Sequence, residues 1–480
     1  MAAEAHAQAH RSVTTRLLGA WRLARLIPLL AQKTLRFYTS GPPHPAWSLS
    51  TFLLCEVARR SDADACADRL ARGHVDRVFE VQQVREGIKF IEVEKVDEAA
   101  IWETAWNVKK RGLRGILEQP DAAEDGIRRV QGEWIAHESV LQRPQSKVCL
   151  FFHGGAYCRA SLKTHRRLVV KASREMGCRV LSVDYRLSPE TKYPGAILDA
   201  VSAYFHLSDD MGIPPNKIIV GGDSAGGNLA FALLLYLRDS RLPQLAGGVL
   251  MSPWVDLTLS LATWDKNKNT DFLSMIPNDP IFPPGLYASE DLLSTPYISP
   301  CLSASLSDLP PLLITAGSCE AILDEITLLA QRAHRDGVDV QYEIFESGVH
   351  VFELVQTADV GKEAMRSIGR WTKDKFGALP TVENARLDDV GKELDGVWAN
   401  EGRTRRTDQS ASMSNEERFL YEYVAQEPPE VKVRPHAHQA AVEAVEDVKR
   451  SIEKASSKLS AKFVQLRPNP AFKAGWFRFS

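Results

Sequence analysis

Six short apolar runs between residues 147 and 345 alternate with segments of helical pattern. The runs are Val148–Phe152, Val180–Val183, Ile218–Val220, Gly248–Met251, Leu312–Thr315 and Val340–Phe345. Because they lack the polar alternation of a strand with one face in water, both faces should be covered by helices. The pattern predicts an α/β fold with a mostly parallel sheet. Ligands of such sheets bind at the carboxyl ends of the strands, so the residues after each run are the first candidates for function.

The chain before these runs shows two other patterns. Residues 47–70 have helical spacing, whereas Val75–Val81, Ile88–Val93 and Ile127–Ile135 alternate apolar and polar residues. Alternation of this kind predicts antiparallel edge strands. The stretch from Ile101 to Glu118 has no clear pattern.

The first 55 residues are basic and amphipathic. No Asp or Glu lies between Ala5 and Cys55, and arginines or lysines recur among the leucines. No run approaches the ~20 apolar residues of a membrane span. Three interpretations stay open: helices that pack on the protein itself, an amphipathic helix at a lipid surface, or an organelle presequence.

The last hundred residues form a charged extension. Residues 402–417 have the composition of a polar connector, and apolar positions from Val445 to Leu466 recur at heptad-like spacing. This heptad-like spacing predicts a short coiled coil or a single amphipathic helix that docks on the protein, a partner or a membrane. We therefore divide the chain into residues 1–72 (N-terminal helices), 73–380 (the α/β core) and 381–480 (the extension).

Composition narrows the function classes. With 480 residues, 44% of them hydrophobic, the chain can bury a large core, and its net charge of −2 gives no overall attraction to nucleic acid. Seven cysteines form no C-x-x-C pair, and no N-x-S/T site is present. We therefore expect reduced thiols and an intracellular protein, cytoplasmic or at a membrane surface, rather than a secreted one.

A glycine-flanked serine follows the third apolar run. The sequence Gly222-Asp223-Ser224-Ala225-Gly226 connects this run to a helical pattern. It predicts a sharp strand-to-helix turn with an exposed, strained Ser224 at its apex, at a helix N-terminus that favours negative charge. The alternative is a Gly-Ser turn that only connects two elements.

A second glycine motif follows the first run. His153-Gly154-Gly155-Ala156 is a chain of small residues whose N–H groups can approach a substrate oxygen closely. We predict an oxyanion hole formed by the N–H groups of Gly154, Gly155 and Ala225, with His153 and Asp223 supporting the loops. A simple chain reversal is the alternative.

A serine nucleophile also needs a base and an acid. His350 follows the last run and is the predicted base, whereas we expect His165 and His334 on helix surfaces. Two carboxylates follow the fifth run. Glu320 should lie in the loop at the end of the strand and Asp324 one turn into a helix over residues 321–335, so we favour Glu320 as the acid, with Asp324 as the alternative.

Together these motifs resemble the hormone-sensitive-lipase-like branch of the α/β-hydrolases, which includes the arylacetamide deacetylases. The resemblance covers roughly residues 145–375. The residues that carry it are His153–Ala156, Asp184–Glu190 with Tyr193-Pro194, Gly222–Asn228, Ser252–Leu257 and His350–Phe352. It implies an α/β-hydrolase fold with a helical cap, made from the N-terminal helices and an insertion at about residues 255–300. It also implies ester hydrolysis through an acyl-serine, without a metal or an organic cofactor.

Three residues depart from the family pattern. Ala156 replaces the last glycine of His-Gly-Gly-Gly, Glu320 replaces the aspartate that opens Asp-Pro-Leu-x-Asp, and Val351 replaces the glycine after the histidine. The first change should narrow the pocket, and the third should stiffen the histidine loop.

The sequence thus predicts a serine carboxylester hydrolase with the triad Ser224, His350 and Glu320, acting on a small-molecule or lipid ester of small or medium acyl length. Two alternatives remain. One is an amidase or deacetylase of arylamides or formamides, and the other is a non-catalytic, membrane-associated scaffold. Peripheral membrane contact would use the N- or C-terminal amphipathic helices.

Overall fold

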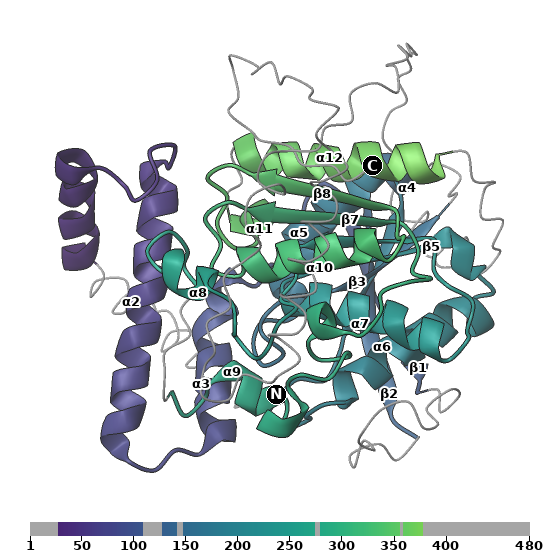
Figure 1. The fold of residues 1–480 in the computed structure, drawn as a ribbon, viewed down its shortest axis with the longest axis horizontal. Coiled ribbons are helices and arrows are strands. Elements are labelled where there is room, and N and C mark those ends of the chain that lie inside the picture. The colour runs from purple at the N-terminus through teal and green to yellow at the C-terminus, as the bar shows by residue number, and fades with distance from the viewer. Residues whose placement is uncertain (1–26, 109–126, 142–146, 274–278, 356–358, 378–480) are drawn as a thin grey trace, which may run out of the picture.

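One mixed sheet organises the protein (Figure 1). The structure is a computed structural model that describes residues 27–108, 127–141, 147–273, 279–355 and 359–377. Its strands have the order β1-β2-β4-β3-β5-β6-β7-β8, antiparallel from β1 to β4 and parallel from there on. The strands are β1 (Ala99–Asn107), β2 (Arg129–His137), β3 (Val148–Phe152), β4 (Arg179–Asp184), β5 (Ile218–Asp223), β6 (Gly247–Met251), β7 (Leu312–Gly317) and β8 (Val340–Phe345). All six predicted parallel strands are confirmed.

Helices cover both faces of this sheet. The larger ones in the core are α5 (Leu162–Met176), α6 (Gly195–Phe205), α7 (Ala225–Asp239), α10 (Leu323–Arg335) and α12 (Asp359–Phe376). Shorter ones are α4 (Glu138–Leu141), α11 (Phe352–Val355), η2 (His206–Asp210) and η3 (Pro215–Lys217). Residues of α5 and α12 pack on one face, where Trp371 is buried, and residues of α6, α7 and α10 pack on the other. The apolar composition of the parallel strands follows from this double covering.

The N-terminal helices form a layer at the side of the sheet, drawn in purple in Figure 1. A helix over residues 27–40 is followed by α2 (Leu49–Arg72) and α3 (Arg77–Ile88). Trp47 and Phe52 pack against Val349, and Val81 of α3 packs against Cys158. Packing on the protein itself is therefore confirmed for these helices, while residues 1–26 lie outside the described part.

Two predicted strands are wrong. Residues 75–81 and 88–93 contain α3 and the short helix η1 (Lys89–Ile91) instead. Asp76 caps α3 by accepting hydrogen bonds from the N–H groups of Val78 and Phe79, and Val81 is buried, so capping and packing override the alternation. The third alternating stretch is confirmed as β2. Its partner β1 overlaps the start of the patternless stretch 101–118, of which residues 109–118 lie outside the described part.

Between β6 and β7 a long insertion passes over the carboxyl edge of the sheet. It contains α8 (Thr263–Lys266), α9 (Pro283–Tyr287), η4 (Glu290–Leu292) and η5 (Pro300–Leu302). Ion pairing of Arg69 with Asp279 joins this segment, called the cap insertion below, to α2. That the two form a helical cap stays a prediction. The segment boundaries given above stay predictions, and the charged extension lies outside the described residues. None of the described helices is both long and apolar enough to cross a bilayer.

Candidate active site

Ser224 occupies the turn between β5 and α7. Its backbone has φ 52° and ψ −122°, a strained conformation that turns the side chain out of the sheet. A Cβ on Gly226 would lie 2.1 Å from the carbonyl oxygen of Phe152, and one on Gly222 would lie 2.3 Å from that of Gly226. Only glycine fits at both places, so the sequence pattern and the geometry of the turn agree.

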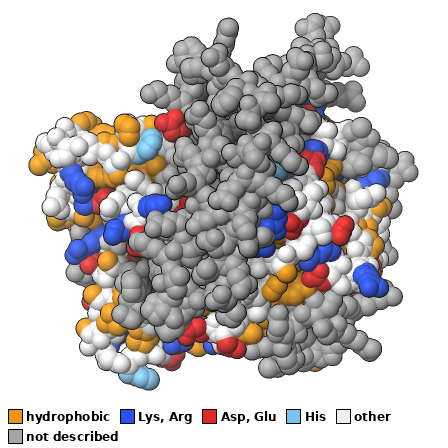
Figure 2. Space-filling model, viewed as in Figure 1, with side chains coloured by type: hydrophobic (Ala, Val, Ile, Leu, Met, Phe, Trp, Pro, Cys, Tyr) orange, Lys and Arg blue, Asp and Glu red, His pale blue; other side chains and the backbone are white. Residues whose placement is uncertain are grey.

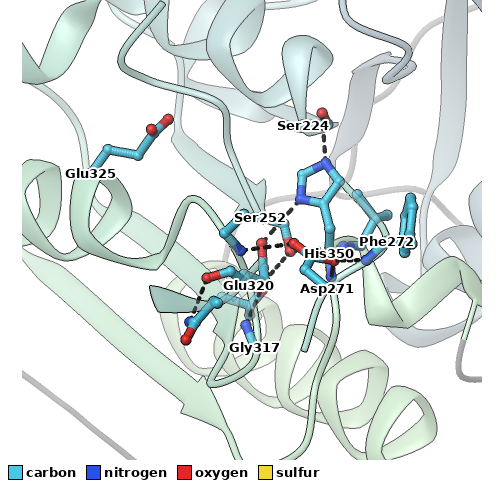
Figure 3. A network of polar contacts seen from close by, with 12 residues as sticks. Ser224, Ser252, Asp271, Phe272, Gly317, Glu320, Glu325 and His350 are labelled. Atoms are coloured by element: carbon cyan, nitrogen blue, oxygen red, sulfur yellow. Dashed lines mark hydrogen bonds and ion pairs between the residues drawn. The ribbon is translucent and has the colours of Figure 1, made fainter. Parts of the chain in front are cut away.

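His350 connects this serine to a carboxylate (Figure 3). Its Nε2 lies 2.8 Å from Ser224 Oγ, and its Nδ1 lies 3.0 Å from Glu320 Oε2. The other carboxylate oxygen of Glu320 accepts hydrogen bonds from the Ser252 hydroxyl, at 2.7 Å, and from the N–H of Gly317. All three side chains of the predicted triad are therefore in contact, and each is buried. Ser224 is thus not exposed as expected, because only 8% of its surface reaches solvent.

Asp324 is engaged elsewhere. Its carboxylate accepts a hydrogen bond from the N–H of Thr263 at 3.1 Å, and its own N–H donates to the Thr263 hydroxyl. These bonds attach α10 to α8. The structure brings Glu320, and not this alternative carboxylate, next to His350.

Burial sets the electrostatics of the histidine and its acid. It lowers the pKa of His350, with the charges of Asp271 and Asp223 opposing this change. Burial also raises the pKa of Glu320, and this rise is larger than the lowering caused by the hydrogen bonds from Ser252 and Gly317. The lowered pKa of His350 favours the neutral imidazole, which is the form that can accept a proton from a hydroxyl.

The oxyanion loop requires one correction. The N–H of Gly154 donates to Asp223 Oδ1 at 3.1 Å, so this group is already used to fasten the loop and is not available to a substrate. The N–H groups of Gly155, Ala156 and Ala225 make no hydrogen bonds within the described part of the chain. Ala156 has φ 54°, a left-handed conformation that costs an alanine about 1 kcal/mol.

His153 lies behind this loop. Its Nδ1 is 2.7 Å from the carbonyl oxygen of Gly154, and its ring stacks on Tyr185 with 4.5 Å between the ring centres. Burial lowers the pKa of His153 to about 4, so the ring is neutral near pH 7. These contacts agree with a supporting role.

His165 is not on a helix surface as expected. It is buried, and its Nε2 lies 3.2 Å from Asp223 Oδ2. Burial lowers its pKa, but the charge of Asp223 and this hydrogen bond outweigh burial, so the pKa is raised. Asp223 thus connects the serine turn to both His165 and the oxyanion loop.

Sequence reasoning missed two residues of the network. Ser252 directly follows β6, and its hydroxyl both donates to Glu320 and accepts from the N–H of Val351. Its position directly after a strand was a usable signal. Asp271, in the cap insertion, accepts hydrogen bonds from the N–H groups of His350 and Ala321, and no local pattern marks it. Within the described ranges, no cluster of three His, Cys, Asp or Glu side chains is arranged to hold a metal ion.

Comparison with known proteins identifies the family. A family profile described as the α/β-hydrolase fold matches residues 149–354. An acetyl-hydrolase of Streptomyces hygroscopicus is 36% identical over 246 residues, which are 51% of this chain and 80% of the relative. The chain belongs to the α/β-hydrolase family.

Two further relatives agree with this α/β-hydrolase assignment. An esterase of Acinetobacter venetianus is 32% identical over 52% of this chain and 83% of its own length. A solved esterase of the bacterial hormone-sensitive lipase family is 30% identical, with a TM-score of 0.52, and the match covers 67% of this chain and 99% of that one. The chain therefore lies in the hormone-sensitive-lipase-like branch.

Proposed function

We propose that this α/β-hydrolase cleaves carboxylic esters through an acyl-enzyme formed at Ser224. The observation that carries the proposal is the position of His350, within hydrogen-bond distance of both the Ser224 hydroxyl and the Glu320 carboxylate. The names of the relatives, an acetyl-hydrolase and esterases, support the same reaction class.

The reaction runs in two halves. Ser224 Oγ attacks the ester carbonyl carbon while His350 Nε2 accepts the hydroxyl proton. The protonated imidazole then gives this proton to the leaving alcohol, and the C–O bond of the ester breaks. Water, deprotonated by the same nitrogen, attacks the acyl-serine and releases the acid. Glu320 accepts a hydrogen bond from Nδ1–H of His350, which keeps the proton on Nδ1 and directs the lone pair of Nε2 at Ser224.

Negative charge on the carbonyl oxygen is stabilised by the N–H groups of Gly155, Ala156 and Ala225. Support comes from their lack of internal hydrogen bonds and from the loop that brings the first two close to the serine turn. The N-terminus of α7 adds a favourable dipole. The Ala156 side chain narrows the site relative to glycine, which favours small or medium acyl groups.

The protein works inside the cell, with the N-terminal helices in contact with lipid surfaces from which lipid esters are taken. Support for the first part comes from seven buried cysteines, all of them free thiols. Support for the second comes from exposed hydrophobic side chains of these helices, such as Leu35, Tyr38 and Phe79. Figure 2 shows hydrophobic and basic side chains side by side at the left of the molecule, where Figure 1 draws the N-terminal helices. Cell fractionation and flotation with anionic vesicles test both.

Substitution of the nucleophile tests the reaction. Ser224→Ala should lower kcat toward p-nitrophenyl esters by about 10⁶-fold, because the acyl-enzyme cannot form. A fluorophosphonate probe should label the wild type and leave Ser224→Ala unlabelled at an unchanged melting temperature. Near-normal hydrolysis by this variant would overturn the proposal, and absence of labelling in the wild type would favour a scaffold.

A substrate series refines the class. The p-nitrophenyl esters from acetyl to palmitoyl measure acyl preference, and the proposal expects the highest kcat/KM at short or medium length. Matched ester and anilide pairs separate an esterase from an amidase. A higher kcat/KM for the anilide would replace ester hydrolysis with amide hydrolysis at the same site.

A further inference from the structure

A second buried carboxylate lies beside the triad. Asp271 has no exposed surface, and its oxygens accept hydrogen bonds from two different loops. Oδ1 accepts from the N–H of His350 at 3.1 Å, and Oδ2 accepts from the N–H of Ala321, the neighbour of Glu320, at 2.8 Å (Figure 3). One rigid group thus spans the loops that carry the base and the acid.

Contacts with the acid loop hold Asp271 in place. Asn267 donates its side-chain N–H to the backbone carbonyl oxygen of Glu320 at 2.7 Å. The hydroxyl of Thr270 donates to the backbone carbonyl oxygen of Cys319 at 3.3 Å. The segment before Asp271 therefore follows the acid loop closely.

Helix α2 fixes Asp271 from the other side. The guanidinium of Arg59 donates Nε–H to the carbonyl oxygen of Asp271 and Nη2–H to that of Asn269, the latter at 2.8 Å. An N-terminal helix thereby holds a residue of the cap insertion, which in turn holds the catalytic loops.

The charge of Asp271 also bears on the chemistry. Burial raises its pKa to about 6, and the positive charge of His350 and the two N–H donors oppose this rise. The ionisable groups around it are His350, Glu320, Arg59 and two thiols, Cys55 and Cys319. Burial raises the pKa of each thiol to about 12, so both thiols are uncharged near pH 7. A carboxylate buried at this cost calls for a reason beyond packing, because a neutral side chain of the same shape would avoid it.

We propose that Asp271 is a positioning residue of the esterase: it fixes the separation of the His350 and Glu320 loops, and its negative charge favours protonated His350. The protonated form arises when Ser224 attacks, so stabilising it lowers the barrier. This inference rests on the proposed function for its kinetic part alone, since the effect on His350 exists whether or not the substrate is an ester.

The test substitutes Asp271→Asn, which preserves shape. Oδ1 of Asp271 also accepts a hydrogen bond from the N–H of Phe272 at 2.7 Å. An amide has one acceptor oxygen, so an NH₂ group would face either the N–H groups of His350 and Phe272 or the N–H of Ala321. We expect kcat, per mole of folded protein, to fall on the order of 10- to 100-fold with KM changed less than about threefold, since small displacements of catalytic groups have effects of this size. The acid limb of the kcat/KM profile should also move to lower pH, because a charge that raises the pKa of His350 is removed.

Asp256→Asn is the matched control. Asp256 is equally buried in the same insertion and accepts N–H groups of Thr258 and Ser260, at 2.9 and 3.0 Å, but has no contact with the triad. This variant should lose stability while its kcat per folded enzyme and its acid limb stay as in the wild type. If Asp271→Asn behaves in the same way, the proposal is wrong.

A spectroscopic measurement makes the test independent of ester hydrolysis. The full-length protein, labelled with ¹⁵N-histidine, is titrated by NMR with and without Asp271→Asn, and the His350 signal is assigned by its loss in His350→Gln. We expect His350 to titrate at lower pH in Asp271→Asn. An unchanged titration overturns the inference, whereas a wild type without esterase activity overturns the proposed function and leaves this measurement valid.

Arg59→Lys covers the case in which Asp271→Asn does not fold. Lysine keeps the charge but cannot bind two carbonyl oxygens in the forked geometry of arginine. A several-fold lower kcat at unchanged KM is expected, and wild-type kcat in this variant would contradict the proposal.

Discussion

Replacement of Glu320 by glutamine is expected to abolish most of the hydrolytic activity, because it changes the tautomer of His350. In the native site Oε1 accepts hydrogen bonds from Ser252 and Gly317, and the N–H of Gly317 cannot reverse its direction. The amide oxygen of the variant must therefore stay at this position, because an NH₂ group there would leave buried donors unpaired at about 1–3 kcal/mol each. The NH₂ group then faces Nδ1 of His350.

A donor at Nδ1 requires that nitrogen to be the acceptor, so the histidine proton moves to Nε2, 2.8 Å from Ser224 Oγ. Nε2 then has no lone pair with which to accept the serine proton. We expect kcat to fall about 10⁴-fold, equivalent to about 5.5 kcal/mol in the barrier, as wrong-tautomer variants of serine triads do. Steady-state hydrolysis of p-nitrophenyl butyrate at pH 8 measures it.

Asp324→Asn is the control for this substitution. It weakens the bond to Thr263 that joins α10 to α8, so about 1 kcal/mol of stability should be lost with kcat within threefold of the wild type. The reasoning fails if the Glu320→Gln variant keeps more than a tenth of the activity, or if Asp324→Asn loses as much.

Two further predictions follow from burial and close packing. Because burial lowers the pKa of His350 and its neutral form is the base, kcat/KM should rise with pH to a plateau with a midpoint below 6.5, and a midpoint above 7 in a pH–rate profile would contradict this. Gly226→Ala should destabilise the fold by about 3 kcal/mol or more in urea unfolding, since its Cβ would overlap the backbone of β3. In Gly285→Ala the Cβ meets no atom within 4 Å, so its stability should stay within about 1 kcal/mol, and equal losses in the two variants would show that overlap is not the cause.

Much of the α/β core could be predicted because local pattern and tertiary role coincide there. The parallel strands are apolar on both faces, and the glycines around Ser224 are dictated by contacts within one turn. Glu320 can be distinguished from Asp324 in the sequence because it lies fewer residues past the strand end, in the loop rather than in the helix.

The rest depends on contacts between distant segments. Asp271 meets His350 across 79 residues, and nothing in its neighbours marks it. His165 has the spacing of a helix surface, yet the serine turn packs over it. The sequence predicts that the N–H of Gly154 binds substrate, because it does not reveal that Asp223 already accepts a hydrogen bond from this group. The α3 helix alternates like a strand, and only its cap and the buried Val81 show otherwise.

The dependence of the catalytic loops on the N-terminal layer has a consequence for biosynthesis. Trp47 donates its indole N–H to the carbonyl oxygen of Ser347, 300 residues later in the chain, at 3.0 Å. At about 5–20 residues per second, a ribosome needs roughly 15–60 s to deliver that partner. During this time Trp47 and Phe52 emerge without the surface that buries them, so newly made chains should be early clients of chaperones that bind apolar segments.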